Sequence, residues 1–115
     1  MDKQLLDDIL ESNFSETDDV YIGNDWDEES YIKGNIEGIR ESKCDPFKLK
    51  AKVAEPGFPG KEIGDEIEGY CIAHQSGQWL VYEPQENTFY CFWGVEPKYV
   101  AARGVSGSAL YCWTA

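Results

Sequence analysis

The chain has 115 residues, of which 42% are hydrophobic and 28% are charged, and its formal net charge at pH 7 is −12. This length and composition are typical of one globular domain, so residues 1–115 are expected to form a single domain. Thirteen acidic and three basic residues fall within positions 1–41, which concentrates the negative charge in the N-terminal third. Phosphate binding needs clustered Lys and Arg, so this charge argues against nucleic acid and anionic membranes as partners.

The start of the chain has no basic segment followed by an apolar one. No apolar run approaches the roughly 18 residues that cross a membrane, and we therefore expect a cytoplasmic protein. The four cysteines are widely spaced and form no C-x-x-C pair: Cys44, Cys71, Cys91 and Cys112. This spacing predicts no metal site, and we expect reduced thiols that pack as small hydrophobic residues.

Residues 2–11 are predicted to form a helix that covers one face of a sheet. Their hydrophobic side chains make one apolar stripe at helical spacing, formed by Leu5, Leu6, Ile9 and Leu10.

Residues 15–30 combine seven acidic side chains with aromatic ones. Such a block is usually a solvated surface, but the apolar residues within it indicate anchoring. A basic protein partner would be attracted by the acids and held by the rings. The candidate partner-binding residues are Asp18, Asp19, Tyr21, Asp25, Trp26, Asp27, Glu28 and Glu29. Their spacing lacks the glycine and terminal glutamate of an EF-hand, so no metal is expected there.

Residues 27–42 fit two structures. Three isoleucines have the spacing of one helix face: Ile32, Ile36 and Ile39. Asp25 and Glu28 are placed as a capping box for such a helix. The alternative is a hairpin that turns at Gly34–Asn35. We favour the helix and keep the hairpin open.

Residues 47–54 alternate between apolar residues and lysines, which is the period of an amphipathic strand. A row of lysines on the wet face protects an edge strand from pairing with other chains. An anion-binding stripe is the functional alternative. Residues 55–60 are predicted to be a loop because they are rich in Pro and Gly, and Ile63 with Ile67 to form a short helical turn.

Residues 69–94 predict an antiparallel meander with strands at 70–74, 78–83 and 88–93. Its turns are expected at Ser76–Gly77 and at 84–87. Pairing Gln75 with Gln78, and Glu83 with Thr88, assigns every side chain to a face. The first face carries Tyr70, Ile72, His74, Trp79, Val81, Tyr90 and Phe92. The second face carries Cys71, Ala73, Leu80, Tyr82, Phe89, Cys91 and Trp93.

Both faces of this meander are apolar, so each must be covered. The N-terminal helices are expected on one face, and the Pro/Gly loop with the C-terminal tail on the other. A second copy or a partner is the alternative cover. Cys71 and Cys91 share a face in this register, but the middle strand separates them, so no disulfide is expected between them.

Residues 95–108 are predicted to be a loop and residues 109–113 a last strand. The predicted fold is therefore α+β. Its antiparallel sheet has strands near 47–54, 70–74, 78–83, 88–93 and 109–113, packed against one or two N-terminal helices.

We expect no enzyme, because no catalytic motif is found, and no cofactor site is predicted. His74 is the single histidine, and the Gly104–Ser108 stretch lacks the second glycine of a nucleophile elbow. The favoured function is a small protein-binding module, of inhibitor or immunity type, with a basic partner. One alternative is a small-molecule-binding protein or modest enzyme with a pocket lined by Trp79, Tyr90, Phe92 and His74. Another is a structural homodimer.

Overall fold

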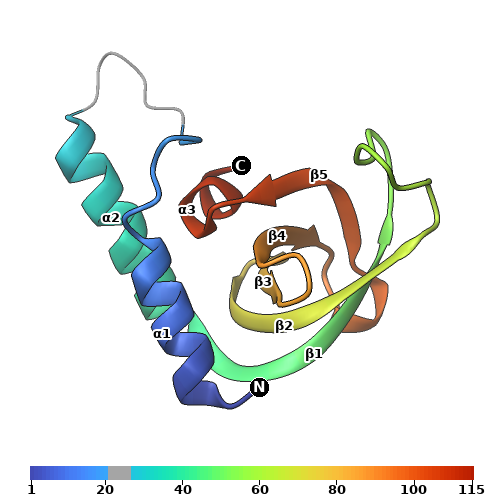
Figure 1. Cartoon of the computed structure of the whole chain (residues 1–115), viewed down its shortest axis with the longest axis horizontal. Coiled ribbons are helices and arrows are strands. Elements are labelled where there is room, and N and C mark those ends of the chain that lie inside the picture. Colours follow the sequence, from blue (N-terminus) through green and yellow to red (C-terminus); the bar gives the residue numbers. More distant parts are fainter. Residues whose placement is uncertain (21–26) are drawn as a thin grey trace.

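The computed structural model describes residues 1–20 and 27–115. It combines helices with a five-stranded sheet, which confirms the predicted α+β class. Its elements are α1 (Lys3–Asn13), α2 (Glu28–Glu41), β1 (Lys43–Val53), β2 (Glu66–Gln75), β3 (Gln78–Glu83), β4 (Thr88–Trp93), the 3-10 helix η1 (Pro97–Tyr99), β5 (Ala101–Gly107) and α3 (Ala109–Thr114). The helices α1 and α2 lie together beside the sheet, and α3 lies between α2 and β5 (Figure 1).

The five strands form a closed barrel in chain order. Each strand pairs antiparallel with the next, and β1 curves beneath β2 to reach β5 (Figure 1). The barrel closes where β1 and β5 run parallel, through the pairs Lys52–Ala101 and Val53–Ala102. In a meander with an odd number of strands, the first and last strands point the same way, so the closing pair must be parallel.

Closure of the barrel covers the inner face of the meander. The interior of a barrel of this size is filled by side chains. Phe58, from the Pro/Gly loop, packs against this inner core with its ring centroid 5.5 Å from that of Tyr90. The buried inner core consists of Leu49, Ala51, Val53, Ile67, Cys71, Trp79, Val81, Tyr90, Phe92, Val100 and Ala102.

The three helices cover the outer face of the meander. Leu6 and Leu10 of α1, Ile39 of α2, and Leu110 of α3 are all buried in one cluster with residues of β2, β3 and β4. The C-terminal tail therefore covers the same face as α1 and α2, whereas it was expected on the opposite face with the Pro/Gly loop. The homodimer hypothesis relied on a sheet face that the helices leave open, and the chain itself buries both faces of the meander.

Both N-terminal helices are capped by aspartates. The Asp2 carboxylate accepts a hydrogen bond from the N–H of Leu5 at 2.8 Å and begins α1. Asp27 is the N-cap of α2 and accepts hydrogen bonds from the N–H of Ser30 at 3.2 Å and its hydroxyl at 2.6 Å. Residues 28–41 are thus a helix and not a hairpin, and its N-cap is Asp27, whereas the predicted cap residue Asp25 lies outside the described residues.

The meander has the predicted strands and turns, and its register is right except at one point. Pairings of β3 with β4 and of Gln75 with Gln78 are as expected. A β-bulge between Cys71 and Ala73 shifts the register, so that Val81 opposes Cys71 instead of Ile72. Cys71 therefore enters the inner core, whereas Ile72 turns to the outer one, where Tyr70 also packs.

Because of the bulge, Cys71 and Cys91 are separated in a different way from the one predicted. Cys71 lies in the inner core and Cys91 in the outer core, so the sheet itself stands between the two sulfur atoms. All four cysteines are free thiols in the structure.

Three predictions of secondary structure were wrong. Residues 101–107 are the closing strand β5 rather than loop, and residues 109–114 are the helix α3 rather than a strand. Ser108 begins α3, because its hydroxyl accepts a hydrogen bond from the N–H of Tyr111 at 3.1 Å. Ile67, expected in a helical turn, belongs to β2.

The strand β1 belongs to the closed barrel, where only the end of its lysine row, at Lys52, pairs with β5. The strand β1 pairs with β2 on one side and β5 on the other. Lys50 and Lys52 lie opposite Glu68 and Glu66 of β2. Opposite charges on paired strands support the register, and they offset the positive charge that an anion-binding stripe would need.

Candidate functional site

A hollow with an apolar floor runs along α2. This hollow, called the α2 groove below, has a volume of about 720 Å³. Ile32 and Ile36 lie one helical turn apart and form its apolar floor, while their other sides pack against the outer core. The α2 groove is lined by Asp27, Glu28, Glu29, Ile32, Lys33, Ile36, Glu37 and Arg40.

The charge of the α2 groove is negative. Four of its lining residues are acidic and two are basic. Arg40 is already engaged elsewhere, because its guanidinium donates to both carboxylate oxygens of Glu11, at 2.6 and 3.1 Å, and lies 5.4 Å above the ring of Phe14. Because the charge of Arg40 is paired with that of Glu11, Arg40 repels a cationic ligand only weakly.

The cap of α2 fixes the charge state at the end of the groove. Hydrogen bonds from the hydroxyl and the N–H of Ser30 lower the pKa of Asp27 below its usual value. Glu28 and Glu29 follow in the first helical turn, where the partial positive charge of the helix stabilises carboxylates. All three side chains are exposed. The three carboxylates at this end are therefore accessible to a ligand.

The predicted partner-binding residues divide into three groups. Asp27, Glu28 and Glu29 lie together in the α2 groove. Asp18 and Asp19 lie elsewhere, in a shallow hollow next to β4 and the start of α3, and Asp19 is hydrogen-bonded to Ser108. The remaining three lie outside the described residues: Tyr21, Asp25 and Trp26.

Sequence reasoning missed the other half of the groove. Ile32, Ile36 and Glu37 were not proposed as site residues, because residues 27–42 also fitted a hairpin, in which they do not share a face. The isoleucine spacing was the signal at hand, since it places Ile32 and Ile36 on one side of a helix next to the acids of its first turn.

The aromatic residues predicted to line a pocket are brought together, but as packed core. Trp79, Tyr90 and Phe92 have at most 7% of their surface exposed and lie inside the barrel. His74 is exposed and stacks on Trp79 with ring centroids 4.6 Å apart. A ligand between these rings would have to displace the inner core, which is unfavourable.

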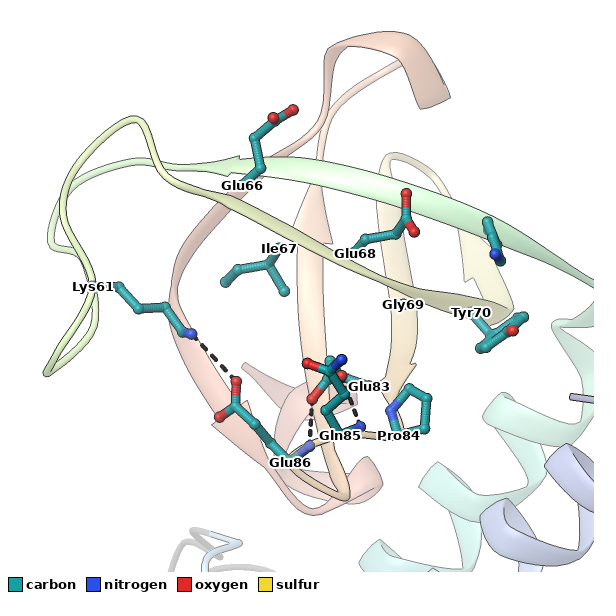
Figure 2. Close-up of a pocket in the computed structure, with 11 residues that line it drawn as sticks. Lys61, Glu66, Ile67, Glu68, Gly69, Tyr70, Glu83, Pro84, Gln85 and Glu86 are labelled. Atoms are coloured by element: carbon teal, nitrogen blue, oxygen red, sulfur yellow. Dashed lines mark hydrogen bonds and ion pairs between the residues drawn. The ribbon is translucent and has the colours of Figure 1, made fainter.

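A second hollow, of about 350 Å³, lies between β2 and the turn that joins β3 to β4 (Figure 2). Four glutamates line it, but their carboxylates interact with other parts of the protein. Both oxygens of Glu83 accept hydrogen bonds from the N–H groups of Gln85 and Glu86 in the turn, at 2.8 and 2.6 Å. Lys61 reaches across the hollow to Glu86 at 3.2 Å, as Figure 2 shows.

The two other glutamates of this hollow also have cationic neighbours. The ammonium of Lys50 lies 3.9 Å from Glu66 and 4.0 Å from Glu68. This hollow has as many acidic and basic lining residues as the α2 groove, but its glutamates are bonded to the turn or lie near lysines, so the α2 groove is the stronger candidate for binding.

Metal binding finds no support in residues 1–20 and 27–115, where no three His, Cys, Asp or Glu side chains come together to hold an ion. Over the same residues, no helix has the length and apolar character needed to cross a membrane. Comparison of the chain with protein-family models, curated proteins and solved structures finds no match.

Proposed function

We propose that the chain is a protein-binding module whose α2 groove takes a basic, partly apolar segment of a partner protein. The observation that carries this proposal is the combination of an isoleucine floor with an acidic rim on one helix. An aliphatic floor gives a partner side chain apolar surface to bury. The acids attract and orient Lys or Arg around it.

The spacing of the floor residues suggests the form of the partner segment. Ile32 and Ile36 lie one turn apart along α2, so a segment that offers apolar side chains at a similar spacing matches them. An amphipathic basic helix has this arrangement and commonly binds in grooves. Among binding modules, inhibitors and immunity proteins that cover a basic site of their partner best fit the small size and the net charge of −12.

The proposal is tested first with a defined probe, a fluorescein-labelled amphipathic helical peptide of Leu and Lys, by fluorescence anisotropy. The groove variant E28K/E29K/E37K reverses three rim charges. We expect it to bind the peptide about tenfold or more weakly than the wild-type protein, and wild-type binding to weaken as salt is raised.

A matched control makes the same change of net charge away from the groove. Glu55, Glu62 and Glu96 are exposed and lie outside the α2 groove, so E55K/E62K/E96K should keep most of the affinity. Equal losses in both variants would mean that the peptide senses net charge alone, and the assignment to α2 would be rejected.

The natural partner is then sought by capture from host lysate with three baits. Proteins retained by the wild-type protein and by the control variant, but lost by the groove variant, are partners of the α2 groove. A partner retained equally by all three baits binds another surface and contradicts the proposal.

A further inference from the structure

Two thiols meet where β1 bends across β2. The pairing of these strands is irregular between Lys43 and Phe47, and Cys44 lies in the irregular stretch. The Cys44 Sγ lies 3.8 Å from the backbone oxygen of Cys71. Cys44 also packs against the inner core to which Cys71 belongs. Both cysteines lie outside the α2 groove, so the chemistry of the pair is independent of the proposed function.

The two thiols differ in access. Cys71 is fully buried, and its Sγ lies 3.6 Å from the backbone oxygen of Ala73. Cys44 is half-buried and lines a hollow of about 450 Å³ between α1 and β1. A small neutral molecule in this hollow lies next to Cys44, whereas Cys71 has no exposed surface and does not line the hollow.

The surroundings also differentiate the two sulfur atoms chemically. A hydrogen bond with the Cys71 thiol is the main reason that the pKa of Cys44 lies below its usual value, and it outweighs burial and the charge of Asp45, which act in the opposite direction. The same hydrogen bond and burial raise the pKa of Cys71. Cys44 is therefore the more acidic thiol of the pair, and the thiolate is the reactive form of cysteine.

We propose that Cys44 and Cys71 form an oxidation-sensitive pair, in which a peroxide oxidises Cys44 and Cys71 then closes a disulfide between β1 and β2. In the first step the Cys44 sulfur attacks one peroxide oxygen, the O–O bond breaks, and Cys44 becomes a sulfenic acid. In the second step the Cys71 sulfur loses its proton and attacks the Cys44 sulfur. The S–O bond breaks and water leaves. With hydrogen peroxide, two thiols and one peroxide give one disulfide and two waters.

The direct test is oxidation of the wild-type protein with hydrogen peroxide, followed by alkylation of the remaining thiols and mass spectrometry. We expect a loss of about 2 Da before alkylation and a cross-linked peptide that joins Cys44 to Cys71. The oxidised protein should also melt at a higher temperature than the reduced one, because the bond closes the loop between these residues.

Variants separate the two steps. C71A should stop at the Cys44 sulfenic acid, a gain of about 16 Da that dimedone traps. C44S should give neither product at the same peroxide dose, while C91A, which removes a buried thiol of the outer core, should still form the cross-link. The proposal is overturned if the wild-type protein forms no cross-link, forms a different one, or accumulates over-oxidised Cys44 without it. This outcome is read in the wild-type protein and does not depend on the folding of any variant.

Discussion

The carboxylate of Asp19 accepts two hydrogen bonds from Ser108, one from its backbone N–H at 2.9 Å and one from its hydroxyl at 2.6 Å. Ser108 is in turn the N-cap of α3. Asn13, at the end of α1, adds a third bond, since its side-chain oxygen accepts from the N–H of Ala109 at 2.7 Å. The end of α1 and the segment that follows it thus satisfy N–H groups that a helix N-terminus leaves open. Sequence reasoning assigned Asp19 to a partner, and the structure gives it a role in holding α3.

This relationship predicts that D19A destabilises the protein. The variant removes both acceptors from Ser108, whose surface is only 8% exposed, and we expect a loss of about 1–3 kcal/mol in the free energy of unfolding. The measurement is urea unfolding followed by tryptophan fluorescence. Asp18 is the matched control, because it is exposed like Asp19 but is not bonded to Ser108, and D18A should change the stability by less than about 0.5 kcal/mol. Equal effects of D19A and D18A would show that the two bonds contribute nothing.

The β3–β4 hairpin and its neighbours were predictable because local residues define them. Ser76 and Gly77 have φ values of 43° and 82°, and Asn87 has 51°, so each turn uses residue types that tolerate the left-handed region. The bulge at Ile72 was not predictable, because it extends the period-2 pattern by one residue without changing its hydrophobic character.

The closing strand escaped prediction for a different reason. Residues 101–107 are mostly Ala, Gly and Ser, with little of the apolar alternation that marks a strand. They pair with β1, which is far away in the sequence, so no local pattern indicates this pairing and it follows only from the closed barrel. For α3, by contrast, a signal was present: Ser108 is a good N-cap, and Ala109, Cys112 and Trp113 are spaced as one helix face.

The candidate site was half predictable. The acidic composition of residues 27–29 was sufficient to identify one end of the α2 groove. Its floor required the choice between helix and hairpin, because Ile32 and Ile36 share a face only in the helix. The aromatic pocket failed because aromatic side chains on two apolar faces are usually core, and closure of the barrel buried them.

The ion pairs of Glu11 predict a specific pH dependence. Hydrogen bonding from Arg40 is the main cause that lowers the pKa of Glu11 from 4.5 to about 2, with Lys43 adding to it. Because the folded pKa is depressed, this stabilisation is complete above the unfolded pKa and is lost as the pH falls from about 5 to about 2. This pKa shift corresponds to about 3 kcal/mol of stabilisation. Because the Glu11 side chain is 33% exposed, screening by solvent reduces the contribution to about 1 kcal/mol.

The variant E11Q measures this contribution. We expect it to be less stable than the wild-type protein by about 1 kcal/mol at pH 7 and for the difference to shrink steadily below pH 5. Urea unfolding at a series of pH values provides the comparison. E16Q is the control, because Glu16 is exposed and makes no side-chain ion pair among the described residues. A deficit of E11Q that is the same at pH 7 and pH 2.5 would argue against the ion pairs as its cause.

Two glycine substitutions should have opposite effects. Gly34 lies in the middle of α2, and a Cβ there meets nothing within 4 Å, so G34A should stabilise the protein by about 0.5–1 kcal/mol. At Gly69 in β2, a Cβ would lie 2.5 Å from the backbone oxygen of Tyr82 and 2.7 Å from the side chain of Val81. G69A should therefore destabilise by roughly 1–3 kcal/mol or more, since the strands β2 and β3 must move apart.

Thermal melts of the two variants, each compared with the wild-type protein, test this pair. The transition of G34A should rise by a few degrees and that of G69A should fall. If alanine is tolerated at Gly69, the close approach of β2 to the Tyr82 backbone is not as tight as the structure has it. Because the two expected shifts in melting temperature have opposite signs, a general effect of replacing glycine by alanine could not produce both.

The burial of the outer sheet face predicts that α3 is essential to stability despite its six residues. Leu110 has 1% of its surface exposed and packs in the outer core with residues of α1, α2 and the meander. L110A should cost about 2–5 kcal/mol, from lost burial and from the cavity that remains. Ile63 is the matched control, because it is 59% exposed and I63A should change the stability by less than about 0.5 kcal/mol.

Urea unfolding gives the stability of both variants, and binding of a hydrophobic dye reports whether the outer face opens. L110A should bind more dye than I63A at equal concentration, because a loosened α3 uncovers the apolar residues of β3 and β4 beneath it. A stable L110A protein that binds no extra dye would mean that α1 and α2 alone are sufficient to cover this face, and that α3 adds little to its stability.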